Sequence, residues 1–266
     1  MKNEGSSMET WKKEWLSSTE GEAYGKLFYQ RATGELPEME SSKAAARRAS
    51  RLLDRDGARI ADIGCGAGHY LRSLRSAVTR PFQYVGVDAT PRYVELAREA
   101  FKGVKEASFQ EGDIFRLPLP DRHADLVMCN NVLLHLPSVA QPVRELARVS
   151  ARRVLVRTLV ADKSYVIRDV APHPEGDEFD DNGEPKAFHF LSIYSRKYLE
   201  RLFRSTGRVR ALSFEPDTDF DANKVSDSGR LLANAWDKTE VASSGMQVSG
   251  MILLPWTWVV VELDAG

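Results

Sequence analysis

Residues 60–69 read IADIGCGAGH, and a second apolar segment, YVGVD, ends at Asp88. The first segment predicts a buried strand that runs into a glycine-rich turn and then a helix, and the second predicts a buried strand with a carboxylate at its carboxyl end. Glycines let the backbone approach a ligand, the N–H groups of the helix favour negative charge, and a carboxylate can accept hydrogen bonds from ribose hydroxyls. This order of features predicts a doubly wound α/β domain that holds a nucleoside.

The glycine spacing distinguishes two kinds of nucleoside site. Gly64, Gly66 and Gly68 give G-x-G-x-G, whereas a dinucleotide fold uses G-x-G-x-x-G. His69 occupies the position of the third dinucleotide glycine, and Asp62 lies inside the strand before the turn. We therefore expect a shorter ligand with a charged amino-acid tail instead of a pyrophosphate.

Length and composition favour a single cytoplasmic domain. The chain has 266 residues, 42% hydrophobic content and a formal net charge of -1, which gives no global attraction to nucleic acid or anionic membranes. Cys65 and Cys129 both fall in predicted core or ligand-loop positions, so we expect no disulfide. The N-terminus lacks a signal-peptide pattern, and no apolar run reaches membrane-spanning length.

Strands and helices alternate through the first part of the chain, as in a parallel sheet covered on both faces. The pattern predicts strands over 58–63, 82–87, 106–110, 124–129 and 153–159, and helices over 41–53, 69–77, 91–102 and 139–149. Beyond Val160 the alternation stops at an acidic stretch over 172–185. A helix over 195–205, a strand over 209–214 and a final strand after Pro255 are then expected.

The segments DIGCGAG and EGDIFRLPLPDRHADLVMCNNVLLHLP, together with Asp88, resemble the class I S-adenosylmethionine-dependent methyltransferases of the small-molecule type (methyltransferase type 11/25-like). The resemblance covers roughly residues 44–159. It implies a Rossmann-like, doubly wound α/β fold with a seven-stranded, mostly parallel sheet, an antiparallel last strand and helices on both faces. One departure is the sequence RVSARRVLVRT, where many relatives have a Leu-x-Pro-Gly-Gly turn, so the turn into the fifth strand must form without glycine.

The same resemblance implies a division of the chain. Residues 1–40 would form an N-terminal helical lid. Residues 41–266 would form the methyltransferase domain, with acceptor-site insertions at about 161–192 and 215–250.

The implied cofactor is S-adenosylmethionine, with S-adenosylhomocysteine as product. Asp62 would accept a hydrogen bond from the methionine ammonium, directly or through water, and Gly64, Gly66 and Gly68 would give the backbone clearance. Asp88 would accept from the two ribose hydroxyls. Each acid could instead cap the nearby turn or helix.

Three further residues extend the expected cofactor site. Asp113 would accept from the adenine amino group, with a loop Asx-turn as the alternative role. Ile114 would supply an apolar face and a backbone N–H to the adenine ring. Asn130 would meet the methionine end of the cofactor, mostly through its backbone.

His189 and His135 are the candidate general bases, with His173 as a further possibility. A base is needed only if the acceptor group must lose a proton of high pKa, so its use stays open. Packing within apolar surroundings is the competing role for each histidine. We expect no metal, because the acidic stretch over 175–184 does not match an EF-hand loop and no His/Cys cluster is present.

The sequence therefore predicts methyl transfer to the oxygen or nitrogen of a small organic acceptor, in the biosynthesis of a specialised metabolite or glycan. No nucleic-acid or membrane partner is expected, and the acceptor and the oligomeric state stay open. One alternative is an enzyme of the same fold that uses the sulfonium for cyclisation, decarboxylation or aminopropyl transfer. The others are a non-catalytic cofactor-binding subunit and an NAD-dependent oxidoreductase, the last disfavoured by His69.

Overall fold

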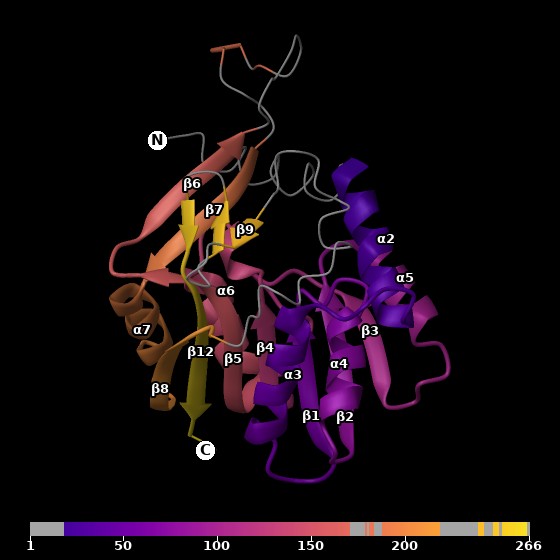
Figure 1. Ribbon diagram of the computed structural model, residues 1–266. Helices are drawn as coiled ribbons and strands as arrows, with labels where there is room; N and C mark the ends of the chain where they lie inside the picture. The colour runs from indigo at the N-terminus through magenta and orange to yellow at the C-terminus, as the bar shows by residue number, and fades with distance from the viewer. Residues whose placement is uncertain are drawn as a thin grey trace.

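The computed structural model describes residues 19–170, 179, 181–183, 188–218, 239–241, 247–249 and 252–264 (Figure 1). The predictions for the first 18 residues of the N-terminal lid, for His173 and for most of the acidic stretch lie outside these residues.

A mostly parallel sheet forms the centre of the molecule, with strand order β3-β2-β1-β4-β5-β12-β8. Every neighbouring pair from β3 to β5 is parallel, and β12 is antiparallel to both β5 and β8. The seven strands are β1 (Ala58–Ile63), β2 (Phe82–Asp88), β3 (Ala107–Glu111), β4 (Ala124–Asn130), β5 (Ser150–Ala161), β8 (Val209–Pro216) and β12 (Trp256–Leu263). The doubly wound fold with an antiparallel last strand is confirmed.

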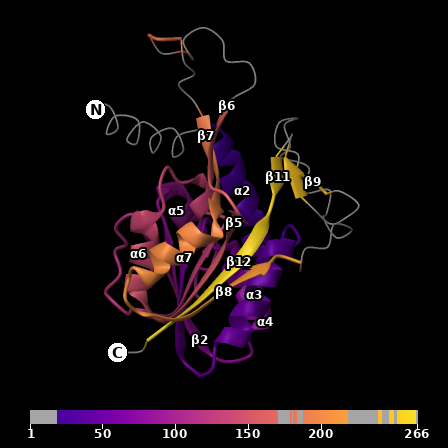
Figure 2. The ribbon, with the colours of Figure 1, turned by 90° about the vertical axis from the view of Figure 1, so that its left-hand side faces the viewer.

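Helices cover both faces of this sheet. Helices α3 (Glu40–Leu52), α4 (His69–Ala77) and α5 (Pro91–Ala100) pack on one face, and α6 (Ala140–Val149) and α7 (Arg196–Arg204) pack on the other. Figure 2 shows α6 and α7 on the opposite side of the strands from α3 and α4. An additional helix, α2 (Thr19–Thr33), contacts α4 and α5.

The burial pattern explains why these segments form strands. All seven residues of β4 are buried, as expected for a central parallel strand covered on both faces. Its alternate residues enter two cores: Val127 and Cys129 pack with α6 and α7, and Leu126 and Met128 pack with α3 and α4. Pro255 separates β11 (Ile252–Leu254) from β12, in agreement with the predicted start of pairing after the proline.

A β-hairpin after β5 was not predicted. Strands β6 (Tyr165–Val170) and β7 (Phe188–Ser195) are antiparallel, and the end of β7 pairs in parallel with Val160 and Ala161 of β5. The sheet therefore has nine strands instead of the expected seven. A separate three-stranded sheet combines β9 (Thr239–Val241), β10 (Gln247–Ser249) and β11.

The glycine-free junction between α6 and β5 is closed by arginine. Arg208 donates to the carbonyl oxygens of Ala147 (2.8 Å) and Ser150 (3.0 Å), and the backbone N–H of Arg122 donates to the carbonyl of Arg148 (2.8 Å). These donors satisfy carbonyls that lack partners at the end of a helix. The helix can therefore pass directly into the strand without a glycine turn.

Two predictions from composition concern the cysteines and the membrane. Cys65 and Cys129 are both free and buried, as predicted. No helix within the described residues has the length and apolarity needed to cross a membrane.

Candidate functional site

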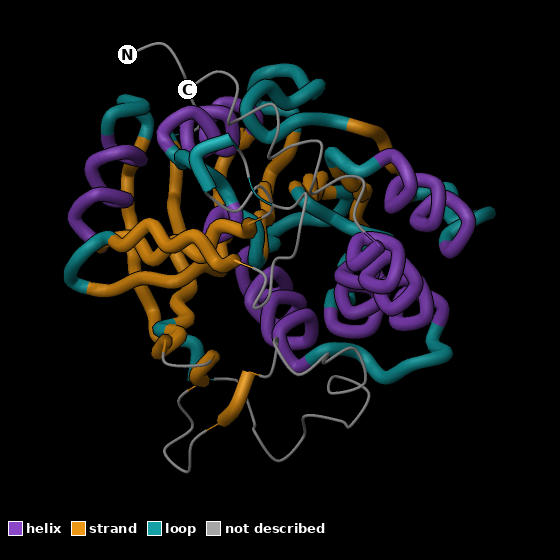
Figure 3. The backbone as a smooth tube through the Cα atoms, turned by 90° about the horizontal axis from the view of Figure 1, so that it is seen from above, coloured by secondary structure: helices purple, strands orange, loops and turns teal. Residues whose placement is uncertain are grey.

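The predicted cofactor residues gather at one edge of the sheet. In Figure 1 the antiparallel β12 points downward, so the carboxyl ends of the parallel strands lie at the upper edge, which Figure 3 views from above. Ligands of open α/β sheets bind at this edge. Asp62, Asp88 and Asn130 lie at or next to the carboxyl ends of β1, β2 and β4.

The loop from β1 to α4 requires its glycines. Gly64, Gly66 and Gly68 all have positive φ, at 78°, 54° and 81°. A Cβ on Gly64 would lie 2.3 Å from Cγ2 of Val132, and a Cβ on Gly68 would lie 2.8 Å from the Phe101 ring. Glycine is therefore required at these positions, both for the left-handed backbone and because neighbouring side chains pack directly against it.

Asp88 organises this loop while facing the edge of the sheet. Its carboxylate accepts hydrogen bonds from the backbone N–H groups of Gly66 (2.8 Å) and Thr90 (2.9 Å). Burial raises the pKa of Asp88, and these two N–H groups act in the opposite direction. These donors hold the Asp88 carboxylate against the glycine loop at the carboxyl end of β2.

Asp62 is almost completely buried, with 1% of its surface exposed. The Tyr84 hydroxyl donates to one of its carboxylate oxygens at 2.8 Å. Burial raises the pKa of Asp62 to about 7, and the nearby Asp88 charge adds to this shift. A cationic ligand group at this position would favour the ionised carboxylate.

Asn130 and His69 present buried polar atoms without partners among the described residues. Both the oxygen and the nitrogen of the Asn130 side-chain amide are in this state, as is Nδ1 of His69. Burial lowers the pKa of His69 to about 3, so the imidazole is neutral. An unpaired buried amide carries a desolvation cost that a bound polar ligand can offset, and both residues adjoin the glycine loop or the end of β4.

Asp113 and Ile114 follow β3 at the same edge. Oδ1 of Asp113 accepts from the backbone N–H of Phe115 at 3.0 Å, which is the Asx-turn noted as its alternative role. Ile114 is buried, with 8% of its surface exposed.

Helix α2 packs across the glycine loop. The Phe28 ring stacks on the His69 ring with centroids 4.5 Å apart, and a Cβ on Gly66 would meet Phe28 at 3.2 Å. Arg31, one turn later on the same helix face, is 7% exposed, and its Nε has no partner in the described part of the chain. Its charge interacts with Tyr70 and His69 at the start of α4.

Arg31 was not identified from the sequence. Its position in YQRATG, at the end of an amphipathic helix, resembles an ordinary cation near a helix carboxyl end. Only the packing of α2 on α4 reveals that it is buried.

The two predicted bases lie on or beside the hairpin. His189 is exposed and pairs with Asp169 across the β6–β7 ladder. It precedes Tyr194, which pairs with β5, by five residues, or about 16 Å of strand. His135 lies in the 3-10 turn Leu133–His135, where Nδ1 is 3.2 Å from the carbonyl oxygen of Phe190. His135 thus contacts the hairpin, and His189 lies exposed on strand β7.

The remaining predictions for this edge concern the two cysteines and a metal site. Burial raises the pKa of both thiols, Cys65 and Cys129, so both stay protonated near neutral pH. In the portion of the chain that the structure covers, no three His, Cys, Asp or Glu side chains are grouped so as to hold a metal ion.

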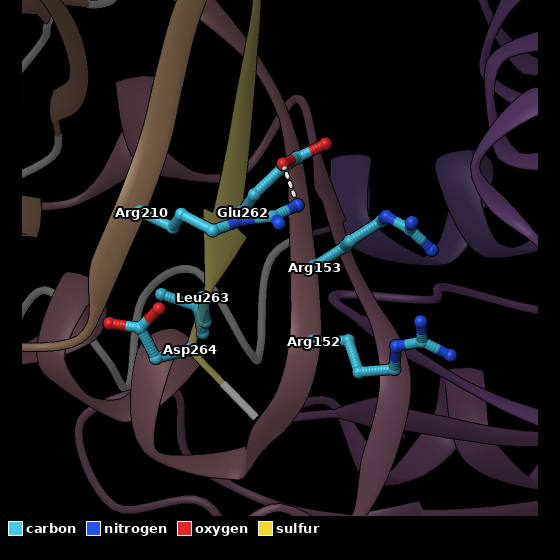
Figure 4. Close-up of a pocket in the computed structure, with 6 residues that line it drawn as sticks. All are labelled: Arg152, Arg153, Arg210, Glu262, Leu263 and Asp264. Atoms are coloured by element: carbon cyan, nitrogen blue, oxygen red, sulfur yellow. Dashed lines mark hydrogen bonds and ion pairs between the residues drawn. The ribbon is translucent and has the colours of Figure 1, made fainter. Parts of the chain in front are cut away.

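A shallow pocket lies at the opposite edge of the sheet (Figure 4). Arg210 pairs with Glu262 there, whereas Arg152 and Arg153 point away from that pair and bind Asp54. These arginines are already paired with carboxylates, and the pocket is at the amino ends of the parallel strands. It is therefore separate from the candidate cofactor site.

Comparison with known proteins agrees with the geometry. A family profile described as "Methyltransferase domain" matches residues 61–155. The chain is 40% identical over 93 residues to "Uncharacterized methyltransferase YcgJ" of Bacillus subtilis, covering 34% of this chain and 36% of that protein. It is 32% identical over 114 residues to "Ajmaline N-methyltransferase" of Rauvolfia serpentina, covering 42% of this chain and 37% of that protein. The matched segment thus spans little more than a third of either relative.

A likeness to a solved structure extends over more of the chain. The crystal structure of the cyclase SpnF superposes with a TM-score of 0.57 over 85% of this chain and 81% of that chain, at 18% identity, which shows the fold alone. The strand order, the glycine loop with its strand-end acids and the matched profile together identify residues 61–155 as a methyltransferase domain with the Rossmann-like, doubly wound fold.

Proposed function

We propose that the protein transfers a methyl group from S-adenosylmethionine to the oxygen or nitrogen of a small organic acceptor. The observation that carries this proposal is the glycine loop held by Asp88, with buried acids at the ends of β1 and β2. Biosynthesis of a specialised metabolite or glycan in the cytoplasm is the setting we expect for it.

The residues present fit this cofactor. Asp88 would accept from the ribose hydroxyls while it keeps its bonds to Gly66 and Thr90. Asp62 would balance the methionine ammonium, and the unpaired amide of Asn130 would bind near the methionine end. Asp113 and Ile114 would hold the adenine.

Arg31 would bind the carboxylate of the methionine moiety. It is a buried cation with an unpaired Nε, and it reaches the start of α4 beside the glycine loop. A buried charge is costly without a counter-charge, and the ligand carboxylate would provide one.

The sequence predicts that residues 1–40 form an N-terminal lid, and helix α2 would be part of it. Phe28 supports this role, because it stacks on His69 and contacts the position above Gly66. The insertions at about 161–192 and 215–250 would then surround the acceptor. Strand β6 and the first part of β7 fall within the first of these segments.

When bound, the cofactor supplies an electrophilic methyl group on a sulfonium. The protein has to hold that group in line with the acceptor atom and to exclude water, and positioning of this kind can contribute up to roughly 7–11 kcal/mol. The exposed His189 is poorly placed to move a proton at such a site, so we propose that positioning is the main contribution of the protein.

Replacement of Asp88 tests this function. Asp88→Ala should weaken calorimetric binding of S-adenosylhomocysteine by at least about 100-fold, since it removes two charge-assisted hydrogen bonds of about 1.5–3 kcal/mol each. Asp125→Ala is the matched control: Asp125 is also 9% exposed, and it accepts from the Arg59 N–H near the amino ends of the strands. Unchanged binding by Asp88→Ala, or equal loss in both variants, would contradict the proposed ribose site.

A further inference from the structure

A buried ion pair lies at the carboxyl ends of the parallel strands, the same edge of the sheet as the candidate cofactor site, but its residues are outside the predicted cofactor motif. Nε of Arg157 donates to Oδ2 of Asp217 at 2.7 Å, and the two side chains are only 3% and 1% exposed. Arg157 comes from β5, and Asp217 directly follows β8. Both strands are antiparallel to β12, so their carboxyl ends share the upper edge with β4.

The arginine is held rigidly from three sides. Its second nitrogen donates to Oδ1 of Asn131 at 2.7 Å, and its guanidinium lies 3.9 Å from the ring centroid of Trp256. Asn131 adjoins the cofactor residue Asn130, and its amide also donates to the Tyr70 hydroxyl (3.4 Å) on α4. The pair is therefore linked to the start of α4 as well as to the end of β4.

Two polar atoms of this cluster have no partner among the described residues. They are Oδ1 of Asp217, which is a hydrogen-bond acceptor, and Nε1 of Trp256, which is a donor. The residues adjoin, because the backbone N–H of Asp217 donates to the carbonyl of Trp256 at 2.9 Å. Leaving such atoms buried and unpaired costs about 1–3 kcal/mol each, and a bound polar group at this edge could offset that cost.

The charge of the cluster restricts that occupant. Arg157 and Asp217 neutralise each other, so a charged ligand group beside them would lack a counter-charge in a buried setting. A neutral hydroxyl can donate to Asp217 and accept from an indole N–H.

The neighbouring side chains are apolar. Trp256 packs against a small cluster of buried residues that comprises Leu134, Leu159, Ile193 and Leu254. These residues come from the 3-10 turn, the end of β5, β7 and β11, so they gather around the same edge. They would suit the apolar body of a ligand whose polar group reaches Asp217.

We propose that Asp217 and Trp256 form the acceptor-recognition site, and that the acceptor is a neutral, largely apolar molecule bearing a hydroxyl group. This inference rests on the proposed methyltransferase function and goes beyond it by naming the acceptor class and the residues that select it. Arg157 positions Asp217 and does not itself meet the acceptor.

The test uses 2-naphthol as the probe, with three matched compounds: its methyl ether, 2-naphthoate and 2-(aminomethyl)naphthalene. Each is titrated calorimetrically into the full chain saturated with S-adenosylhomocysteine. We expect 2-naphthol to bind at least about tenfold more tightly than the ether, the anion or the cation, which corresponds to about 1.4 kcal/mol.

Three variants locate the effect. Asp217→Asn can still accept from Arg157 but can turn a donor toward the position of Oδ1, so it should weaken 2-naphthol binding by about tenfold or more. Trp256→Phe keeps the ring and removes the donor, and should weaken binding several-fold. Trp258→Phe is the control: the Trp258 ring also lies near Arg157 (5.8 Å) and has an unpaired indole N–H, but Trp258 is fully buried in the core beside α3.

Indole spectra separate recognition from a general loss of structure. The ¹H–¹⁵N indole signal that is missing from Trp256→Phe should shift when 2-naphthol is added, and the signal missing from Trp258→Phe should stay in place. Variants are compared only at equal S-adenosylhomocysteine affinity.

Three results would overturn the inference. They are equal affinity of the wild-type protein for the four compounds, equal affinity of Asp217→Asn and wild type for 2-naphthol, and no binding of 2-naphthol at millimolar concentration. If S-adenosylhomocysteine binds normally in those cases, the proposed function stands and only the acceptor assignment fails. If the wild-type protein does not bind S-adenosylhomocysteine, the proposed function and this inference fail together.

Discussion

Individual buried side chains determine what this site can bind. Asp62 and Arg31 illustrate this, because each carries a charge in a place where water cannot solvate it well. In both cases the free energy of the charged form depends on whether a ligand group of opposite charge is present.

The pH dependence of the free energy of unfolding should show the raised pKa of Asp62. The pKa of its carboxyl is raised from an ordinary 3.8 to about 7 in the folded protein, so the folded state holds this proton more tightly than the unfolded chain. Protonated Asp62 therefore contributes to the free energy of unfolding. This contribution is fully present below about pH 4 and is lost as the pH rises to about 7, by up to about 1.4 kcal/mol per pH unit.

Urea unfolding of wild type and Asp62→Asn between pH 4 and 8 measures this effect. The wild-type free energy of unfolding should fall relative to that of the variant up to about pH 7 and then run parallel to it. Parallel curves throughout would show that Asp62 titrates in its ordinary range.

The proposed role of Arg31 predicts a ligand-specific loss. Arg31→Gln should weaken binding of S-adenosylhomocysteine by about tenfold, the equivalent of about 1.4 kcal/mol, because the ligand carboxylate loses its counter-charge. 5′-Methylthioadenosine has no carboxylate and should bind wild type and variant equally. If calorimetry shows that both ligands lose affinity alike, Arg31 supports the fold and not the carboxylate.

Secondary-structure elements could be predicted where the pattern of apolar and polar residues within the segment itself indicates a strand or a helix. The strand over 58–63 and the helix over 69–77 agree with β1 and α4, because their apolar patterns and glycine signals lie within the segments themselves. Strands β6 and β7 were missed, since their stability depends on pairing Tyr165 with Ile193 across intervening chain. The periodicity of a segment does not show which distant segment it pairs with.

The junction between α6 and β5 gives a test at this scale. Arg208→Ala removes the donors to Ala147 and Ser150 and should lower the free energy of unfolding by about 1–3 kcal/mol. Arg204→Ala is the control, because its pair with Glu200 is exposed and worth about 0.3–0.5 kcal/mol. Equal urea midpoints for the two variants would contradict the capping role of Arg208.

At the scale of the whole molecule, the sheet brings distant residues to one edge. Asp62, Asp88 and Asn130 could be placed there from sequence, because each ends or nearly ends a strand. Arg157 stands out in the sequence as a charged residue inside the apolar run VLVRTLV. Its partner Asp217 is 60 residues away, so the ion pair could not be predicted from the sequence. The proposed acceptor residues could therefore be found only from the fold, whereas the candidate cofactor residues were predicted from the motif.

We propose that the upper edge of the sheet binds S-adenosylmethionine. Calorimetric titration of the purified wild-type protein with S-adenosylmethionine, S-adenosylhomocysteine and NADH tests it most directly. We predict binding of both sulfur ligands at micromolar affinity and none of NADH, because the loop has His69 where a dinucleotide site needs glycine. Binding of NADH, or no binding of either sulfur ligand, would contradict the account.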